Sequence, residues 1–141
     1  MNYLLDTNVI SETFKQNINQ NVNSFLSNIK RKCMFLSVYT IGELCFGVEK
    51  LPVSKKKHDL SIWLYSKIPL WFNKRILSLN NEIMINWGNL RALSKRTLPI
   101  DDSIIAATAL TNNMILVTRN IKDYIDIPDL KLINPWEYQD T

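Results

Sequence analysis

The sequence predicts an α/β domain of three layers, in which helices cover both faces of a central, mainly parallel sheet. Short apolar segments typical of buried strands alternate along the chain with segments of helical periodicity. Such alternation favours parallel strands joined by helical crossovers. The 141 residues are enough for one domain with a substantial core, and no repeat or long linker divides them. We therefore expect a single domain over residues 1–141.

Five short apolar segments are the predicted strands. They comprise residues 3–5, 34–36, 75–79, 114–117 and 130–133. Parallel strands place their carboxyl ends at one edge of the sheet, where open α/β sheets bind ligands. We therefore expect the polar residues that follow three of these strands, namely 6–8, Ser37 and 118–120, to meet at that edge.

The first helices follow from apolar spacing. Val9, Ile10 and Phe14 predict a short helix directly after the first strand. A second, amphipathic helix begins near Val22 and repeats its apolar residues at i+3, i+4 and i+7. We expect it to end in the basic residues 30–32, because cations suit the negative end of a helix dipole.

The central helices have recognisable start and stop signals. Ser37 is the expected N-cap of a helix that runs to Leu51 and is stopped by Pro52. A further helix is predicted over residues 54–67, with Pro69 ending it.

Two more helices are expected in the second half of the chain. Ile83, Trp87 and Leu90 mark one face of a long helix. The next helix, over residues 101–110, is rich in alanine, which would let it lie close against the sheet.

Composition excludes several functional classes. Three glycines and no Gly-rich phosphate motif argue against a nucleotide-binding loop. His58 is the single histidine and lies beside a lysine run, so neither a Ser-His-Asp hydrolase nor a histidine-dependent ribonuclease is expected. Cys33 and Cys45 lack metal or disulfide spacing and are expected to be reduced thiols. Any catalysis is expected to depend on carboxylates.

Charge and hydropathy indicate the expected surroundings. The net charge is +4 and the pI is about 9.1, which favours an anionic partner. Basic groups at residues 30–32 and 55–57 and at Arg91, Lys95 and Arg96 could follow phosphates, although exposed charged runs are more often simply solvated. No apolar run reaches the roughly 18 residues of a membrane span, and no signal peptide is evident. We expect a cytoplasmic protein without a membrane partner.

Acidic residues accompany the predicted polar edge. They are Asp6, Glu43, Asp101 or Asp102, and Asp123. Each has an ordinary alternative role: a helix cap for Asp6 and for the 101–102 pair, and a surface charge for the other two. Several carboxylates at the ends of separate elements would repel one another unless they share a cation. Carboxylate oxygens suit Mg²⁺ or Mn²⁺.

Four segments, in order and at similar spacing, resemble PIN domains, in particular VapC-type and FitB-like toxins of bacterial toxin–antitoxin pairs. They are residues 4–12 (LLDTNVISE), 37–47 (SVYTIGELCFG), 102–109 (DSIIAATA) and 116–124 (LVTRNIKDY). The closing Asn134-Pro135-Trp136 is similar to FitB-like tails. The resemblance covers nearly the whole chain and implies a PIN-like α/β/α fold.

The resemblance also implies site residues. Asp6, Glu43 and Asp102 match the catalytic, metal-holding acids, with Asp102 preferred to Asp101 because it directly precedes the small residue of the Ile-Ala-Ala helix. The fourth position of the family is often Asp, whereas here it is Asn120.

Asp123, in the next turn, is the other candidate for that fourth position. Thr7, Asn8 and Thr118 are expected to orient the carboxylates.

The implied function is that of a Mg²⁺-dependent endoribonuclease toxin, with Mn²⁺ as a substitute ion. Metal-activated water would cleave RNA and leave a 5′-phosphate and a 3′-hydroxyl. A cognate VapB-type antitoxin would cover the acidic cleft. The toxin would form a homodimer or a larger toxin–antitoxin assembly. The toxin–antitoxin complex would bind its promoter DNA through the antitoxin.

Two alternatives belong to other classes. A haloacid-dehalogenase-type phosphatase needs a second acid two residues after the first, where this chain has Asn8. A PIN fold that is weakly active or inactive, and only binds nucleic acid or a partner protein, is the alternative that Asn120 favours.

Overall fold

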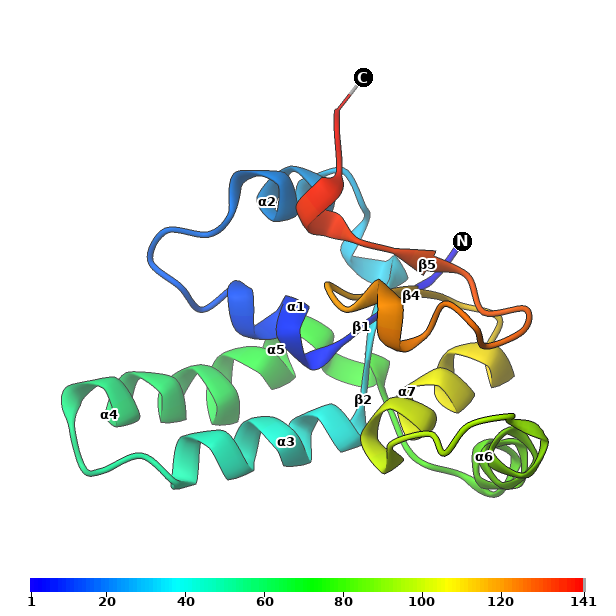
Figure 1. Ribbon diagram of the computed structural model, residues 1–141. Helices are drawn as coiled ribbons and strands as arrows, with labels where there is room; N and C mark the ends of the chain where they lie inside the picture. Colours follow the sequence, from blue (N-terminus) through cyan, green and yellow to red (C-terminus); the bar gives the residue numbers. More distant parts are fainter. Residues whose placement is uncertain (141) are drawn as a thin grey trace.

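The computed structural model describes residues 1–140, and a five-stranded sheet lies at its centre (Figure 1). The strands are β1 (Tyr3–Leu5), β2 (Met34–Ser37), β3 (Ile76–Leu77), β4 (Ile115–Val117) and β5 (Leu132–Ile133). Their order is β3-β2-β1-β4-β5, and every pair of neighbours is parallel. The predicted parallel sheet is therefore confirmed, with β1 in the middle.

Each face of the sheet has its own hydrophobic core, because side chains of successive strand residues point to opposite sides. Leu5 and Val117 belong to one core, while their neighbours Leu4 and Leu116 belong to the other. The first core is covered by α1 (Thr7–Glu12), α2 (Gln20–Ser27), α3 (Val38–Glu49), α4 (Lys55–Ile62) and α5 (Ile68–Phe72). The second is covered by α6 (Asn81–Leu93) and α7 (Ile100–Thr111). These two cores confirm the predicted three-layer architecture.

Helix α2 ends earlier than its apolar spacing predicts. The Asn28 N–H bonds to the carbonyls of Ser24 and Phe25 and closes the last turn. The basic residues instead enter a separate 3-10 turn, Arg31–Cys33. The prediction that this helix ends in residues 30–32 is wrong, because β2 begins at Met34 and the chain must turn toward the sheet first.

The helix that starts at Lys55 does not end at Pro69. A π-helical turn (Trp63–Lys67) follows α4 and leads directly into α5, in which Pro69 occupies the first turn. The wider π turn already breaks the regular hydrogen-bond pattern, so the N–H that proline lacks costs little there. Ile68 and Phe72 are fully buried and hold this continuation against the core. No helix among residues 1–140 combines the length and the apolar character that crossing a membrane requires.

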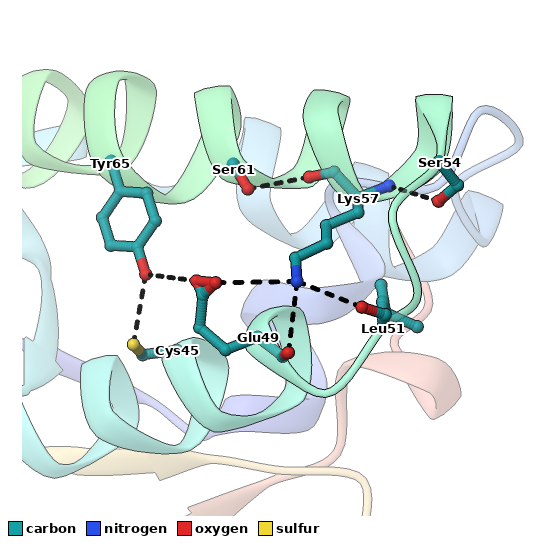
Figure 2. Close-up of polar contacts among 7 residues, drawn as sticks. All are labelled: Cys45, Glu49, Leu51, Ser54, Lys57, Ser61 and Tyr65. Carbon is teal, nitrogen blue, oxygen red and sulfur yellow. Dashed lines mark hydrogen bonds and ion pairs between the residues drawn. The ribbon is translucent and has the colours of Figure 1, made fainter.

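Helices α3 and α4 form an antiparallel pair whose turn is closed by Lys57 (Figures 1 and 2). The Lys57 ammonium donates to the backbone carbonyls of Glu49 at 3.2 Å and of Leu51 at 3.1 Å, at the carboxyl end of α3. Farther along, the Tyr65 hydroxyl donates to the Glu49 carboxylate at 3.3 Å and lies 3.2 Å from the Cys45 sulfur. Carbonyls at a helix end need such partners. Lys57 is thus engaged by the protein itself.

Candidate active site: an acidic pocket at the sheet edge

The middle strands β1 and β4 end side by side and place two polar residues in contact. Leu5 pairs with Val117, and the Asp6 N–H donates to the Val117 carbonyl at 2.9 Å. The next residue of β4, Thr118, donates its hydroxyl to the Asp6 Oδ2 atom at 2.9 Å. The sheet register alone therefore brings residues 6 and 118 together at the predicted edge.

Asp6 is held from several directions. Its Oδ1 accepts the Thr7 N–H at 2.8 Å, so Asp6 also caps α1, as its alternative reading suggested. Its Oδ2 accepts from Thr118 and from the Tyr124 hydroxyl at 3.2 Å, with the Asn8 amide at 3.5 Å. Burial raises the pKa of Asp6, because it disfavours the charged form, and these donors act against that rise. The side chain is 7% exposed, so its ionisation is costly without a nearby cation.

Glu43 faces Asp6 from α3. The helix begins where the Ser37 hydroxyl caps it by accepting the Tyr39 N–H at 3.0 Å, which agrees with the predicted N-cap. One turn later, Glu43 Oε1 accepts the Thr7 hydroxyl at 2.6 Å. Burial raises the pKa of Glu43, and the negative charge of neighbouring carboxylates adds to the rise. Thr7 therefore orients Glu43 from the residue next to Asp6.

Asp101 and Asp102 enter from the first turn of α7. Pro99 occupies the N-cap position, so these two acids do not cap the helix; they favour it only through their charge near its positive end. Asp102 Oδ1 accepts the Tyr124 hydroxyl at 3.3 Å. Burial, followed by the charges of Asp101 and Asp123, raises the pKa of Asp102 to about 6. Asp101 is more exposed than Asp102.

The two candidates for the fourth position are separated by the turn after β4. Asn120 lines the pocket, and its N–H donates to the Thr118 hydroxyl oxygen at 3.1 Å. Asp123 lies in the following 3-10 turn, Ile121–Asp123, and is not among the lining residues within the described part of the chain. Its charge nevertheless contributes to the raised pKa of Asp102.

These side chains surround one open pocket of about 300 Å³. It is lined by Asp6, Thr7, Asn8, Ser11, Glu43, Asp101, Asp102, Ile105, Asn120 and Tyr124. The structure thus brings together all the predicted acids except Asp123. Thr118 lies beneath the pocket, fully buried.

The donor set suits a divalent cation of the Mg²⁺ type. Asp6 and Asp102 are both joined to one hydroxyl, that of Tyr124, and both have raised pKa values, so a positive charge between them would favour their ionised forms. Within residues 1–140, no three His, Cys, Asp or Glu side chains converge closely enough to chelate an ion by themselves. Mg²⁺ commonly uses one or two carboxylates and keeps several waters, so the pocket fits an ion of that kind.

Sequence reasoning gave no role to Tyr124. Its hydroxyl contacts both Asp6 and Asp102. In the sequence, an aromatic residue after a polar turn is typical of an ordinary core residue. The sequence offered only its place at the end of the segment 116–124, so the contact had to be found in three dimensions.

Comparison with known proteins finds matches over nearly the whole chain. The sequence model of the PIN domain family matches residues 3–128. Toxin FitB from Neisseria gonorrhoeae is 32% identical over 136 residues, which cover 94% of this chain and 97% of that protein. Ribonuclease VapC2 from Rickettsia felis is 32% identical over 145 residues, covering 97% and 99%.

Solved structures of the same two systems share the fold. The crystal structure of FitAcB from N. gonorrhoeae superposes with a TM-score of 0.88 at 32% identity and covers 96% of this chain and 99% of its counterpart. VapBC2 from R. felis, bound to a DNA fragment from its promoter, gives a TM-score of 0.69 at 27% identity. The superposition covers 95% of this chain and 98% of its counterpart.

Proposed function

Since the chain belongs to the PIN-domain family, we propose that it is a divalent-metal-dependent endoribonuclease that acts as the toxin of a toxin–antitoxin pair. The observation that carries this proposal is the acidic pocket, where Asp6, Glu43 and Asp102 meet at the carboxyl edge of the sheet. One relative named as a ribonuclease and another named as a toxin support the choice of substrate and role.

Asp6 and Asp102 are the proposed ligands of the cation, with Mg²⁺ as the expected ion and Mn²⁺ as a substitute. A cation bound there would lower the pKa of water and stabilise the charge that develops on the phosphate oxygens. The protein supplies the rigidity: Thr118, Thr7 and Asn8 hold the Asp6 carboxylate in one orientation.

Glu43 is proposed to accept the proton of the attacking water, or to help hold the cation. Its raised pKa brings it closer to the range in which a carboxylate works as a base. The Thr7 hydroxyl fixes one carboxylate oxygen, Oε1. Cleavage in this manner would leave a 5′-phosphate and a 3′-hydroxyl.

Asn120 lines the pocket at the fourth family position and is proposed to orient a water or a phosphate through its neutral amide. An uncharged group binds a cation less strongly than a carboxylate, so Asn120 also keeps open the second candidate function, a weakly active or inactive module that only binds nucleic acid or a partner. Asp123 is proposed to act on the site through its charge, which adds to the raised pKa of Asp102.

Arg119 is the proposed phosphate contact of the RNA. It directly follows Thr118, its backbone N–H donates to the Asn8 side chain at 3.1 Å, and its guanidinium stacks 4.9 Å from the centre of the Trp136 ring. Stacking holds the guanidinium in place while leaving its donors available for a phosphate. Arg96, by contrast, is paired with Asp126 at 2.7 Å.

The proposed partner is a VapB-type antitoxin that covers the acidic pocket, with the toxin forming a homodimer or a larger assembly. Promoter DNA would be bound by the toxin–antitoxin complex through the antitoxin. The DNA-bound complex of the Rickettsia relative supports this arrangement.

Mutation of the acids tests the proposal. We expect Asp6→Ala and Asp102→Asn to abolish cleavage of total bacterial RNA in Mg²⁺, as EDTA should in the wild-type protein. Asp59→Asn, an exposed acid on α4, is the matched control and should retain full activity. Cleavage that survives EDTA or either pocket substitution contradicts the metal mechanism.

A wild-type protein that neither cleaves RNA nor binds Mn²⁺ would favour the inactive module. For an active protein, sequencing the 5′ ends of RNA fragments after induced expression identifies the target.

A further inference from the structure

Tyr124 is a buried aromatic residue whose hydroxyl contacts two acids of the pocket. Its side chain is 1% exposed and packs in the second core together with Leu4, Ile105 and Leu116. The ring is therefore fixed by its neighbours, and the hydroxyl at its tip has little freedom to move.

The hydroxyl joins two acids that come from opposite parts of the chain. It lies 3.2 Å from Asp6 Oδ2, after β1, and 3.3 Å from Asp102 Oδ1, at the start of α7. A hydroxyl has one proton to donate, so the two carboxylates share a single donor. This bridge is a direct connection between the end of β1 and α7.

We propose that the Tyr124 hydroxyl is a positioning group that holds the Asp6 and Asp102 carboxylates together in the arrangement that receives the divalent cation. The inference rests on the proposed function. Two ionised carboxylates repel each other, and without the Tyr124 donor the Asp102 carboxylate would be free to rotate away from Asp6. A hydrogen bond from a fixed ring restrains both before the ion arrives, which reduces the ordering that metal binding requires.

Asp6 and Asp102 depend on this bridge to different degrees. Asp6 has further donors in the Thr7 N–H and the Thr118 hydroxyl. Asp102 stands on the first turn of α7, partly exposed, and takes the Tyr124 hydroxyl as its tertiary contact. We therefore infer that Tyr124 acts mainly through Asp102.

The substitution Tyr124→Phe separates packing from positioning, since it keeps the ring and removes only the hydroxyl. The matched control is Tyr138→Phe, because the Tyr138 hydroxyl accepts a hydrogen bond from Asn28 at 3.1 Å, away from the pocket. Mn²⁺ is titrated into each purified full-length protein by calorimetry, and RNA cleavage is measured in parallel.

For Tyr124→Phe we expect Mn²⁺ to bind about tenfold more weakly, as is typical when a group that orients a ligand is lost. Cleavage at saturating Mn²⁺ should show a lower kcat with little change in KM, because the hydroxyl acts through the two acids that it contacts. Tyr138→Phe should match the wild-type protein in all three quantities.

Further outcomes keep the inference separate from the proposed function. Wild-type Mn²⁺ affinity in a folded Tyr124→Phe protein overturns the inference and leaves the proposed function intact. A wild-type protein that binds no Mn²⁺ overturns both. If Tyr124→Phe lowers the melting temperature, titration below that temperature, with folding checked by circular dichroism, still decides the question. The Asp102→Asn and Tyr124→Phe substitutions should also be non-additive in Mn²⁺ affinity, and strict additivity would count against a shared arrangement.

Discussion

The hydroxyl of Thr118 donates to the carboxylate of Asp6 at 2.9 Å and joins the ends of β1 and β4. The same hydroxyl oxygen accepts the Asn120 N–H at 3.1 Å and the Asn8 amide at 3.3 Å. One buried threonine thus organises three residues that line the pocket.

Replacing Thr118 by valine keeps the shape and removes all these hydrogen bonds. We expect the free energy of unfolding to fall by about 1–3 kcal/mol, because buried polar groups lose their partner. Thr108→Val is the matched control: Thr108 is equally buried, but its hydroxyl donates to the Ile104 carbonyl of its own helix, so the loss should stay near or below about 0.5 kcal/mol. Urea denaturation measures both, and equal losses would contradict the special role of Thr118.

Asp102 should make stability depend on pH in the metal-free protein. Its pKa rises from 3.8 to about 6 on folding, so the folded state binds more protons than the unfolded state between these values. This stabilising contribution is complete below about pH 3.8 and is lost as the pH rises through about 6.

The difference in unfolding free energy between the wild-type protein and Asp102→Asn isolates this contribution. In EDTA, between pH 4 and pH 7, we expect the wild-type protein to lose about 1–2 kcal/mol of unfolding free energy relative to Asp102→Asn. The loss is smaller than the full pKa shift of Asp102 would give, because water screens this partly exposed acid. A difference that is flat with pH, or that changes in the other direction, refutes this assignment.

Lys57 should stabilise the turn between α3 and α4 (Figure 2). Lys57→Met keeps most of the aliphatic chain and removes the ammonium, so we expect a loss of about 1 kcal/mol in unfolding free energy. Lys56→Met changes an exposed neighbour in the same run and should have almost no effect. Equal effects of the two substitutions in urea denaturation would show that the contacts of Lys57 are energetically neutral.

Arg119 should serve RNA binding without serving metal binding. Arg119→Gln is expected to raise KM for RNA several-fold and to reduce its dependence on salt, while Mn²⁺ affinity stays constant. Arg91→Gln is the matched control, since Arg91 also stacks on a tryptophan, 4.8 Å from the centre of the Trp87 ring, but on α6. A KM that responds equally to both changes would indicate only a general charge effect.

Local signals in the sequence were sufficient to predict several of the strands and helices that make up the fold. The apolar run before Asp6 and the cap at Ser37 act within a few residues of the chain, so strands β1 and β2 and the start of α3 could be predicted from neighbouring residues alone. The resemblance to PIN domains is confirmed by the match over residues 3–128.

The tertiary structure overruled two of the local signals. Pro69 is a helix breaker by itself, but the π turn before it and the burial of Ile68 and Phe72 carry the helix past it. Likewise, the basic residues 30–32 suit a helix end, but the chain leaves α2 at Ser27 to reach β2. In the first case burial in the core outweighs local propensity. In the second, the basic residues stay exposed and the chain enters β2 at Met34.

The sequence by itself determined the fold class and which acids stand at the ends of elements, because strand–helix alternation and capping depend on near neighbours. Only the tertiary structure decided how these acids meet: that Asn120 and not Asp123 lines the pocket, that Thr7 links to Glu43, and that Tyr124 bridges Asp6 and Asp102. These contacts join residues up to 118 positions apart, and they depend on sheet register and core packing, which no local pattern encodes.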